Sequence, residues 1–204
     1  MNILTSQPPE TVDIGGRSVP IASGFREGIR FEMMALDENL TADHILANYF
    51  GADWPEPYDE AIRAAIWFYH CGEEQTEEKP EPEPKKKLKN NRRSYDFEID
   101  AEAIYTSFLQ TYGIDLLAEN LHWWIFRALL LGLPDETPFK QRVYYRIGRT
   151  KGMSAKQKRD FEERRKRYKL PERGAIDHKL SLLERDTAIK KYVAERFKEV
   201  NAKS

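Results

Sequence analysis

The fold is decided by two neighbouring stretches, Asp100-Ala-Glu-Ala-Ile-Tyr-Thr-Ser-Phe-Leu-Gln-Thr-Tyr-Gly113 and Leu121-His-Trp-Trp-Ile-Phe-Arg-Ala-Leu-Leu-Leu-Gly-Leu133. In the first stretch, apolar residues recur at intervals of three and four from Ala101 to Tyr112, which is the spacing of one helix face. Aspartate before such a run is a typical N-cap, and glycine after it is a typical stop. The second stretch is apolar on almost every side, which predicts a helix at the centre of a bundle.

A short β-hairpin is predicted near the N-terminus, over residues 11–21. Val12 and Ile14 alternate with polar residues, as in a strand with one buried face, and Gly15-Gly16 has the composition of a tight turn. Pro20 restricts the returning strand to a sheet edge or a short pairing, because proline has no amide proton to donate.

Helical spacing accounts for most of the remaining chain. Three helices are expected over about 25–36, 42–49 and 58–69. The second of the two stretches quoted above adds a helix near 119–131, and a further helix is expected over about 138–147.

The last quarter of the chain has a different character. Ser154 and Gln157 form a capping box for a helix that runs to about Tyr168 with few large apolar residues. Core burial cannot hold such a helix, so we expect it to project into solvent. A final helix carries Val193 and Phe197 on a narrow apolar stripe, which can dock on the body or pair with another copy.

Composition divides the chain into four parts. Residues 73–93 contain no apolar residue except Leu88, and three prolines interrupt them, so a charged Pro-rich linker is expected. The predicted parts are an N-terminal hairpin plus helices (1–72), this linker, a compact helical unit (94–150) and a basic helical C-terminal arm (151–204). The predicted fold class is mainly α, with a small N-terminal β-hairpin followed by a helical bundle and a projecting C-terminal helical arm.

The expected compartment is the cytoplasm. The single cysteine, Cys71, excludes an intramolecular disulfide and fits a reducing environment. The first residues lack a basic region followed by an apolar stretch, so no secretion signal is expected. The longest apolar run, from Trp123 to Leu133, is interrupted by Arg127 and is too short to span a bilayer.

The net charge of −1 hides a strong asymmetry. Residues 1–84 carry a net charge of −12, whereas residues 140–204 carry +12. Opposite charges at the two ends favour head-to-tail self-association or the binding of a charged partner. The alternative is that the basic residues only solvate an exposed helix.

The sequence contains no recognisable catalytic or metal-binding motif. It lacks a Walker A sequence, G-x-G-x-x-G, G-x-S-x-G and H-E-x-x-H. His70 and Cys71 are adjacent, so their side chains diverge on a helix and cannot form a nucleophile–base pair. His44, His122 and His178 have no paired spacing for a metal. We therefore expect a protein that is not an enzyme and holds no cofactor or metal.

The candidate protein-binding residues are Trp123, Trp54, Val193 and Phe197. Trp123 and Trp124 lie about 100° apart on a helix, so both cannot enter one contact. Either one tryptophan belongs to the core and the other anchors a partner, or both are buried in a small bundle. Trp54 sits in a Gly-Ala-Asp-Trp-Pro loop, where it is either a plug for the core or a contact point.

Nucleic-acid binding is the rival function. Residues 140–170 carry 13 Lys or Arg against 3 acidic groups, which is the type of stripe that phosphate binding needs. Aromatic residues are sparse there, Glu162 and Glu163 interrupt the stripe, and no reader module is present. We therefore expect proteins, rather than nucleic acid, to be the partners.

Several segments are similar to a known family. The most specific are Tyr-Gly-Ile-Asp-Leu at 112–116 and Leu-His-Trp-Trp at 121–124. The others are Val12-Asp-Ile-Gly-Gly, Phe25-Arg-Glu-Gly-Ile-Arg-Phe-Glu and Ala65-Ile-Trp-Phe-Tyr-His-Cys-Gly. Together they resemble the small phage proteins called gene product fifteen, which siphophages and prophages of low-GC Gram-positive bacteria encode. The resemblance covers most of residues 10–150.

The resemblance implies a role in phage tail assembly. Such proteins are encoded between the major tail protein and the tape-measure protein, and proteins in that position generally act as tail assembly chaperones. The implied partners are the tape-measure protein, the major tail protein and further copies of the chain. The family offers no catalytic residues to carry over. A permanent structural component of the virion, or a nucleic-acid-binding accessory protein, remains the alternative.

Overall fold

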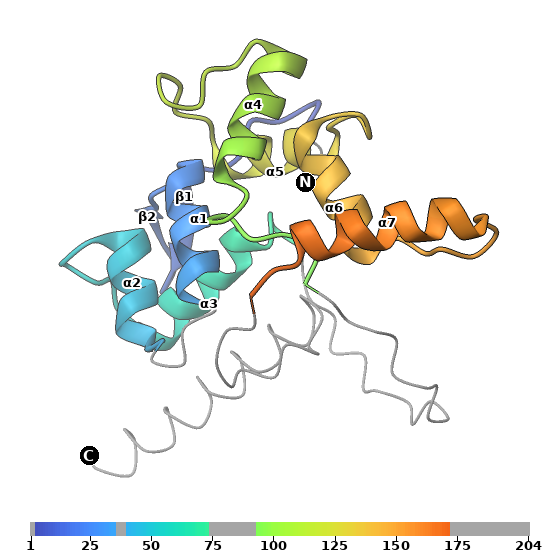
Figure 1. Ribbon diagram of the computed structural model, residues 1–204. Helices are drawn as coiled ribbons and strands as arrows, with labels where there is room; N and C mark the ends of the chain where they lie inside the picture. The colour runs from blue at the N-terminus through green and yellow to red at the C-terminus, as the bar shows by residue number, and fades with distance from the viewer. Residues whose placement is uncertain (1–2, 36–39, 74–92, 172–204) are drawn as a thin grey trace. The chain divides into compact units, whose positions relative to one another are not determined.

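The computed structural model describes residues 3–35, 40–73 and 93–171, which form seven helices and a two-stranded antiparallel sheet (Figure 1). The mainly α fold with an N-terminal hairpin is confirmed. The body of the predicted linker and the predicted last helix lie outside the described residues. The elements are β1 (Thr11–Ile14), β2 (Arg17–Pro20), α1 (Phe25–Met34), α2 (Ala42–Phe50), α3 (Tyr58–Tyr69), α4 (Ala101–Tyr112), α5 (Trp123–Leu131), α6 (Pro138–Ile147) and α7 (Ala155–Tyr168).

The described chain divides into two compact units. The first unit comprises residues 3–35, 40–73 and 121–126, and the second comprises residues 93–120 and 127–171. Helix α5 therefore contributes its first residues to one unit and its remaining residues to the other. The structure differs from the sequence-based division in two ways. Residues 121–126, predicted to belong with 94–150, join the first unit, and residues 151–171, predicted as part of a separate arm, belong to the second unit.

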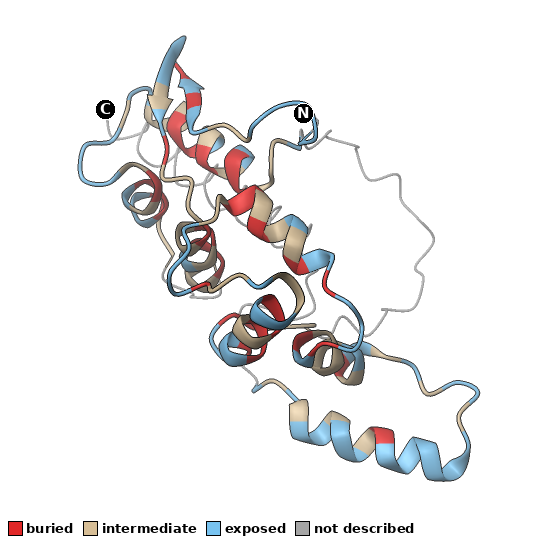
Figure 2. Ribbon diagram, turned by 90° about the horizontal axis from the view of Figure 1, so that it is seen from above, coloured by how far each residue is buried: buried red, intermediate tan, exposed pale blue. Residues whose placement is uncertain are grey.

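The first unit packs the hairpin and helices α1 to α3 around an aromatic core. Val12 and Ile14 are buried on the inner face of β1, as their alternation predicts, and Val12 pairs with Val19 across the sheet. In the same unit, the ring of Phe31 lies against Tyr49 and Tyr69, with centroid separations of 5.7 and 4.5 Å. Figure 2 shows the buried residues of these helices gathered on one side of each, as amphipathic spacing requires.

Helix α5 begins later than its apolar pattern suggests. Phe25 donates its amide to the carbonyl of Leu121 at 2.8 Å, and Trp123 donates to the carbonyl of Ser23 at 2.8 Å. This isolated antiparallel bridge holds the backbone before Trp123 extended, so the helix cannot include the preceding residues. Within the described part of the chain, no helix is both long and apolar enough to cross a membrane.

Local side-chain bonds set several helix ends. Thr41 and His44 form a capping box at the start of α2, and Ser154 and Gln157 form the predicted one at the start of α7. Gly113 ends α4 in the left-handed conformation that glycine adopts without steric cost, at φ 69°.

The second unit is built on α4, α6 and the end of α5. Ser107 on α4 is fully buried, and its hydroxyl donates to the carbonyl of Ala103 at 2.6 Å. The same hydroxyl accepts the amide of Phe139, at the start of α6, at 3.2 Å. Tyr112 donates its hydroxyl proton to the carbonyl of Leu129 on α5 at 2.9 Å. These bonds join the three helices where apolar packing alone would leave polar groups unsatisfied.

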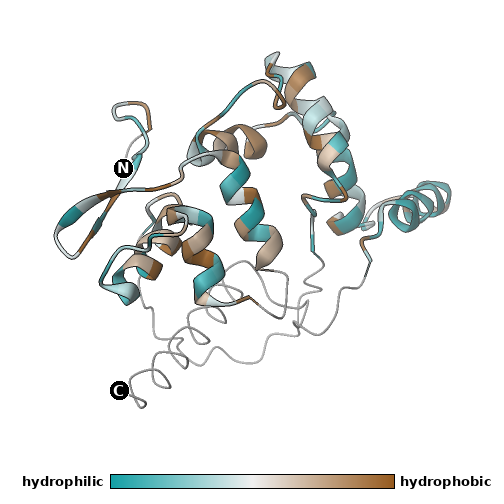
Figure 3. Ribbon diagram, turned by 90° about the vertical axis from the view of Figure 1, so that its left-hand side faces the viewer, coloured by the Kyte–Doolittle hydropathy of each residue, from teal (hydrophilic) through white to brown (hydrophobic). Residues whose placement is uncertain are grey.

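Helix α7 is hydrophilic along most of its length but is attached to α6 (Figure 3). Phe161 is buried between Tyr144 and Tyr145, with ring centroids 5.4 and 5.2 Å away. Arg165 donates to the carbonyls of Tyr145 and Gly148. The expectation that core burial cannot hold this helix is therefore corrected, because buried Phe161 and arginine-to-carbonyl bonds attach its inner face to α6. Its outer face is exposed, as expected.

Candidate protein-interaction surfaces

His122 is held by hydrogen bonds to the backbone. His122 accepts the amide proton of Trp124 on Nδ1 at 3.1 Å, so Nε2 carries the proton and donates to the carbonyl of Pro9 at 3.0 Å. Burial lowers the pKa of His122, which favours the neutral ring. Cys71 is half-buried. Among the described residues, no three His, Cys, Asp or Glu side chains are grouped to hold a metal ion.

Trp123 does not lie on the surface, so its prediction as a partner contact is corrected. Its side chain is 1% exposed. The indole stacks on Tyr69 with centroids 5.6 Å apart, and its Nε1 donates to the carbonyl of Tyr69 at 2.9 Å. Trp124 is also buried and donates to the carbonyl of Phe68 at 2.7 Å. Both tryptophans therefore belong to the core of the first unit, the second of the two alternatives that the sequence left open.

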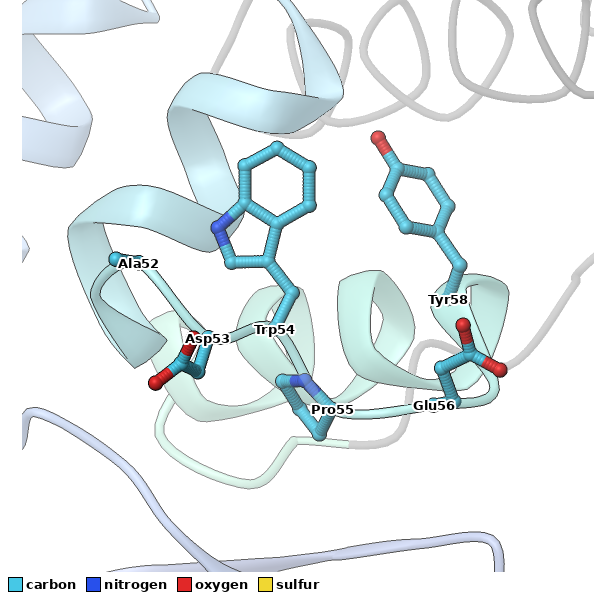
Figure 4. Close-up of a pocket in the computed structure, with 6 residues that line it drawn as sticks. All are labelled: Ala52, Asp53, Trp54, Pro55, Glu56 and Tyr58. Carbon is cyan, nitrogen blue, oxygen red and sulfur yellow. The ribbon is translucent and has the colours of Figure 1, made fainter.

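Trp54 remains exposed and forms one wall of a shallow hollow in the loop between α2 and α3 (Figure 4). Its Nε1 donates to the carbonyl of Gly51 at 2.9 Å, which orients the indole. The ring of Tyr58 stands beside it, with centroids 6.0 Å apart and planes tilted by 56°. The hollow has a volume of about 350 Å³ and is lined by Ala52, Asp53, Trp54, Pro55, Glu56 and Tyr58.

Tyr58 is also held in place. Its hydroxyl donates to the carboxylate of Asp43 at the start of α2. Burial raises the pKa of Tyr58, and the bond to Asp43 raises it further, so the phenol stays protonated as a donor. Two hydrogen bonds thus fix both aromatic walls, leaving Asp53 and Glu56 as exposed carboxylates at the rim.

A buried ion-pair cluster in the second unit was not anticipated from the sequence. Asp100, expected to cap α4, makes no side-chain capping bond. Its fully buried carboxylate instead accepts bonds from Arg146, which is itself 5% exposed, and from Arg142 at 3.1 Å. Arg146 also donates to the carbonyls of Ser94 and Tyr168. The cluster connects the start of α4 with α6 and the end of α7, and its role is structural.

The second unit leaves several large apolar side chains in solvent. Leu117, in the loop after α4, is 78% exposed, and Leu131, the last residue of α5, is 71% exposed. Further exposed side chains on the helices of this unit are Leu109, Tyr144 and Ile147. Exposed apolar side chains mark a site of protein interaction where they form a contiguous patch.

The outer face of α7 is the strongest basic surface in the described chain. Residues 151–169 carry 9 Lys or Arg and 3 acidic residues, giving +6. Lys156, Arg159 and Arg167 are exposed, on the side of the helix that does not carry Phe161. The other two predicted contact residues, Val193 and Phe197, lie outside the described residues.

Comparison with known proteins assigns the chain to a family. No curated protein and no solved structure matches it. The family described as bacteriophage Gp15 protein matches residues 4–170, which covers both units and α7. Since this match extends over well more than half of the 204 residues, the chain belongs to the bacteriophage Gp15 protein family.

Proposed function

We propose that this protein is a tail assembly chaperone of a long-tailed phage. It binds the tape-measure protein reversibly, keeps it soluble and assists assembly of the tail tube from the major tail protein, without catalysing a reaction. Membership of the Gp15 family supports a structural or assembly role in a phage. The gene position that the resemblance implies, between the major tail protein and the tape-measure protein, motivates the finer assignment.

The exposed leucines of the second unit are the observation on which this proposal rests. Amphipathic helices bind other proteins by placing an apolar stripe against apolar side chains of the partner. Leu117 and Leu131 are largely solvent-exposed, so a partner helix can cover them without displacing the core. The 33% charged residues keep such a protein soluble while these apolar groups are uncovered.

Co-expression with the tape-measure protein tests the proposal. The wild-type chain is expected to bring the tape-measure protein into the soluble fraction and to co-purify with it after nuclease treatment. The double variant Leu117→Ser/Leu131→Ser is expected to lose this ability, while its free energy of unfolding stays within about 0.5 kcal/mol of wild type. Leu4→Ser is the matched control, since Leu4 is 90% exposed in the first unit and its variant should still solubilise the partner.

Two results would reject the chaperone function, and a third would reject only the proposed contact surface. Recovery that disappears with nuclease indicates binding through nucleic acid, for which the basic face of α7 is the natural site. A chain that remains in purified virions at fixed stoichiometry is a permanent structural component. Equal solubilisation by the wild type and by the double leucine variant would show that these leucines are not the contact surface.

A further inference from the structure

The hollow beside Trp54 has the chemistry of a site for a cationic side chain. Indole and phenol faces attract Lys and Arg through their ring quadrupoles, and tryptophan does so most strongly. Trp54 and Tyr58 present two such rings 6.0 Å apart, and Figure 4 shows both standing on the same side of the loop. Asp53 and Glu56 add carboxylates at the rim. An ammonium or guanidinium group can therefore meet aromatic faces and negative charge together.

The segment that carries the hollow is acidic. Residues 42–60 contain five acidic residues and no Lys or Arg. Asp59 is paired with Arg63, and Glu60 accepts the amide of Gly15 at 2.6 Å. The carboxylates that remain exposed at the hollow are Asp53 and Glu56, which makes them the residues to vary.

The complementary surface lies on α7. Because Phe161 is buried against α6, the direction of the helix is set and its opposite side faces solvent. Lys156 and Arg159 are exposed and three residues apart, so they share one face of the helix. The capping box at Ser154 holds the helix start independently of these two charges. Substituting them therefore changes the surface without removing an anchor.

We propose that the basic face of α7 docks its Lys and Arg side chains into the acidic Trp54–Tyr58 hollow of a second copy of this chain. The two surfaces belong to different segments of the chain, so one copy can offer its hollow while another offers its basic helix. Such a heterologous contact extends head to tail. The +6 of residues 151–169 and the acidic hollow supply the charge complementarity, and the aromatic rings supply a preference for this site. This association does not depend on a tape-measure protein.

A charge-swap experiment tests the contact in the full chain. Variant A carries Asp53→Lys/Glu56→Lys, and variant B carries Lys156→Glu/Arg159→Glu. Sedimentation velocity at low salt should give a weight-average mass above the 23.9 kDa monomer for wild type and about 23.9 kDa for each variant alone. An equimolar mixture of A and B should associate again, because the unchanged basic helix of A fits the unchanged hollow of B, and the lysine-bearing hollow of A meets the glutamate-bearing helix of B.

Two further measurements identify the chemistry. Trp54→Ala should weaken self-association by roughly threefold to tenfold, as expected for the loss of one cation–π contact. Association should also fall steeply between 0.05 and 0.5 M salt, since exposed charges are screened over about 10 Å at 0.1 M. Glu102→Lys/Glu136→Lys is the matched control, because it makes the same change in net charge on the second unit and should associate like wild type.

The outcomes separate this proposal from its rivals. A wild-type chain that stays monomeric at every concentration overturns it. Variants that are monomeric alone and also in the mixture overturn it too, because a contact between copies requires rescue on mixing. Association that survives both charge swaps would place the interface elsewhere on the chain.

Discussion

At single residues, the packing of the first unit depends on a glycine that lies under a tryptophan. A methyl group added at Gly28 would stand 2.2 Å from the Trp123 ring. Alanine normally stabilises a helix interior by about 1 kcal/mol relative to glycine. Here the tertiary contact reverses that preference, since the ring is held by Tyr69 and cannot move away.

We therefore predict that Gly28→Ala destabilises the protein by about 1–3 kcal/mol, the usual cost of overpacking a core. Urea unfolding of the variant measures it. In a Trp123→Leu background the same substitution should cost much less, because the ring that it meets is gone. A Gly28→Ala variant more stable than wild type would contradict the packing described for α1.

Asp100 makes stability depend on acid pH. Burial by itself raises the pKa of Asp100, but the hydrogen bonds and charge of Arg146 outweigh it and hold the pKa below its usual value. A folded-state pKa below the unfolded value of about 3.9 means that the stabilisation is complete above that pH. It is lost as the pH falls through the folded-state pKa. Acid should therefore weaken the cluster only below about pH 4.

We predict that Asp100→Asn costs about 3–5 kcal/mol at pH 7, because it leaves the buried Arg146 without a counter-charge. The difference from wild type should shrink as the pH is lowered below about 4, because the carboxylate of the unfolded wild-type chain is protonated there first and that of the folded chain at its lower pKa. Denaturant unfolding at pH 3 and pH 7 measures both. Asp135→Asn, at an exposed aspartate of the same unit, should change neither value appreciably.

At the scale of elements, α7 is held by few contacts and should open before the rest of its unit. Phe161 is its only buried residue, and the remaining attachment consists of arginine bonds to backbone carbonyls and to the Tyr145 hydroxyl, together with the stacking of Tyr168 on Tyr145. A helix of this composition has little apolar surface with which to resist local opening. We therefore expect α7 to open locally while α4 and α6 stay folded.

Phe161→Ala is predicted to raise the amide hydrogen exchange of residues 155–168 at least tenfold, since core Phe→Ala changes cost about 3–5 kcal/mol. Exchange in α1 to α3 should remain unchanged. Lys158→Ala, at an exposed position of the same helix, is the control and should leave the exchange of α7 within about threefold of wild type. Uniform loss of protection across the whole chain would contradict separate opening of α7.

At the scale of the whole molecule, α5 is shared between the two units. The helix gives residues up to Phe126 to the first unit and the rest to the second, so unfolding either unit removes support from the same helix. The four tryptophans, at positions 54, 67, 123 and 124, all belong to the first unit. Tryptophan fluorescence thus reports on one unit, while far-ultraviolet circular dichroism reports on both.

We predict that the denaturation curves followed by these two signals coincide at pH 7, as in a two-state transition. A fluorescence midpoint separated from the circular dichroism midpoint would show that the units unfold independently. The Asp100→Asn variant sharpens the test, because its change lies in the second unit. If the units are cooperative, that substitution should move the fluorescence midpoint as well.

The sequence by itself determined the elements of this protein. Six of the seven described helices lie close to where helical spacing predicts them, and the Gly15-Gly16 turn and the Ser154 capping box appear as expected. These features depend on residues within one or two turns of each other, so a local pattern contains the information. The family resemblance rests on short specific motifs in the same segments, and the family match confirms it. It implied a function that helical periodicity alone does not indicate.

Only the tertiary structure decided which side chains are buried in the core. Trp123 is buried because its indole bonds to Tyr69, 54 positions earlier, and Asp100 is an ion-pair partner because Arg146, 46 positions later, reaches it. The start of α5 was set by a bridge to residues near Gly24, on a distant part of the chain. Local periodicity shows that a residue is apolar or charged. Its use in the core or at the surface depends on partners that the chain brings together only by folding.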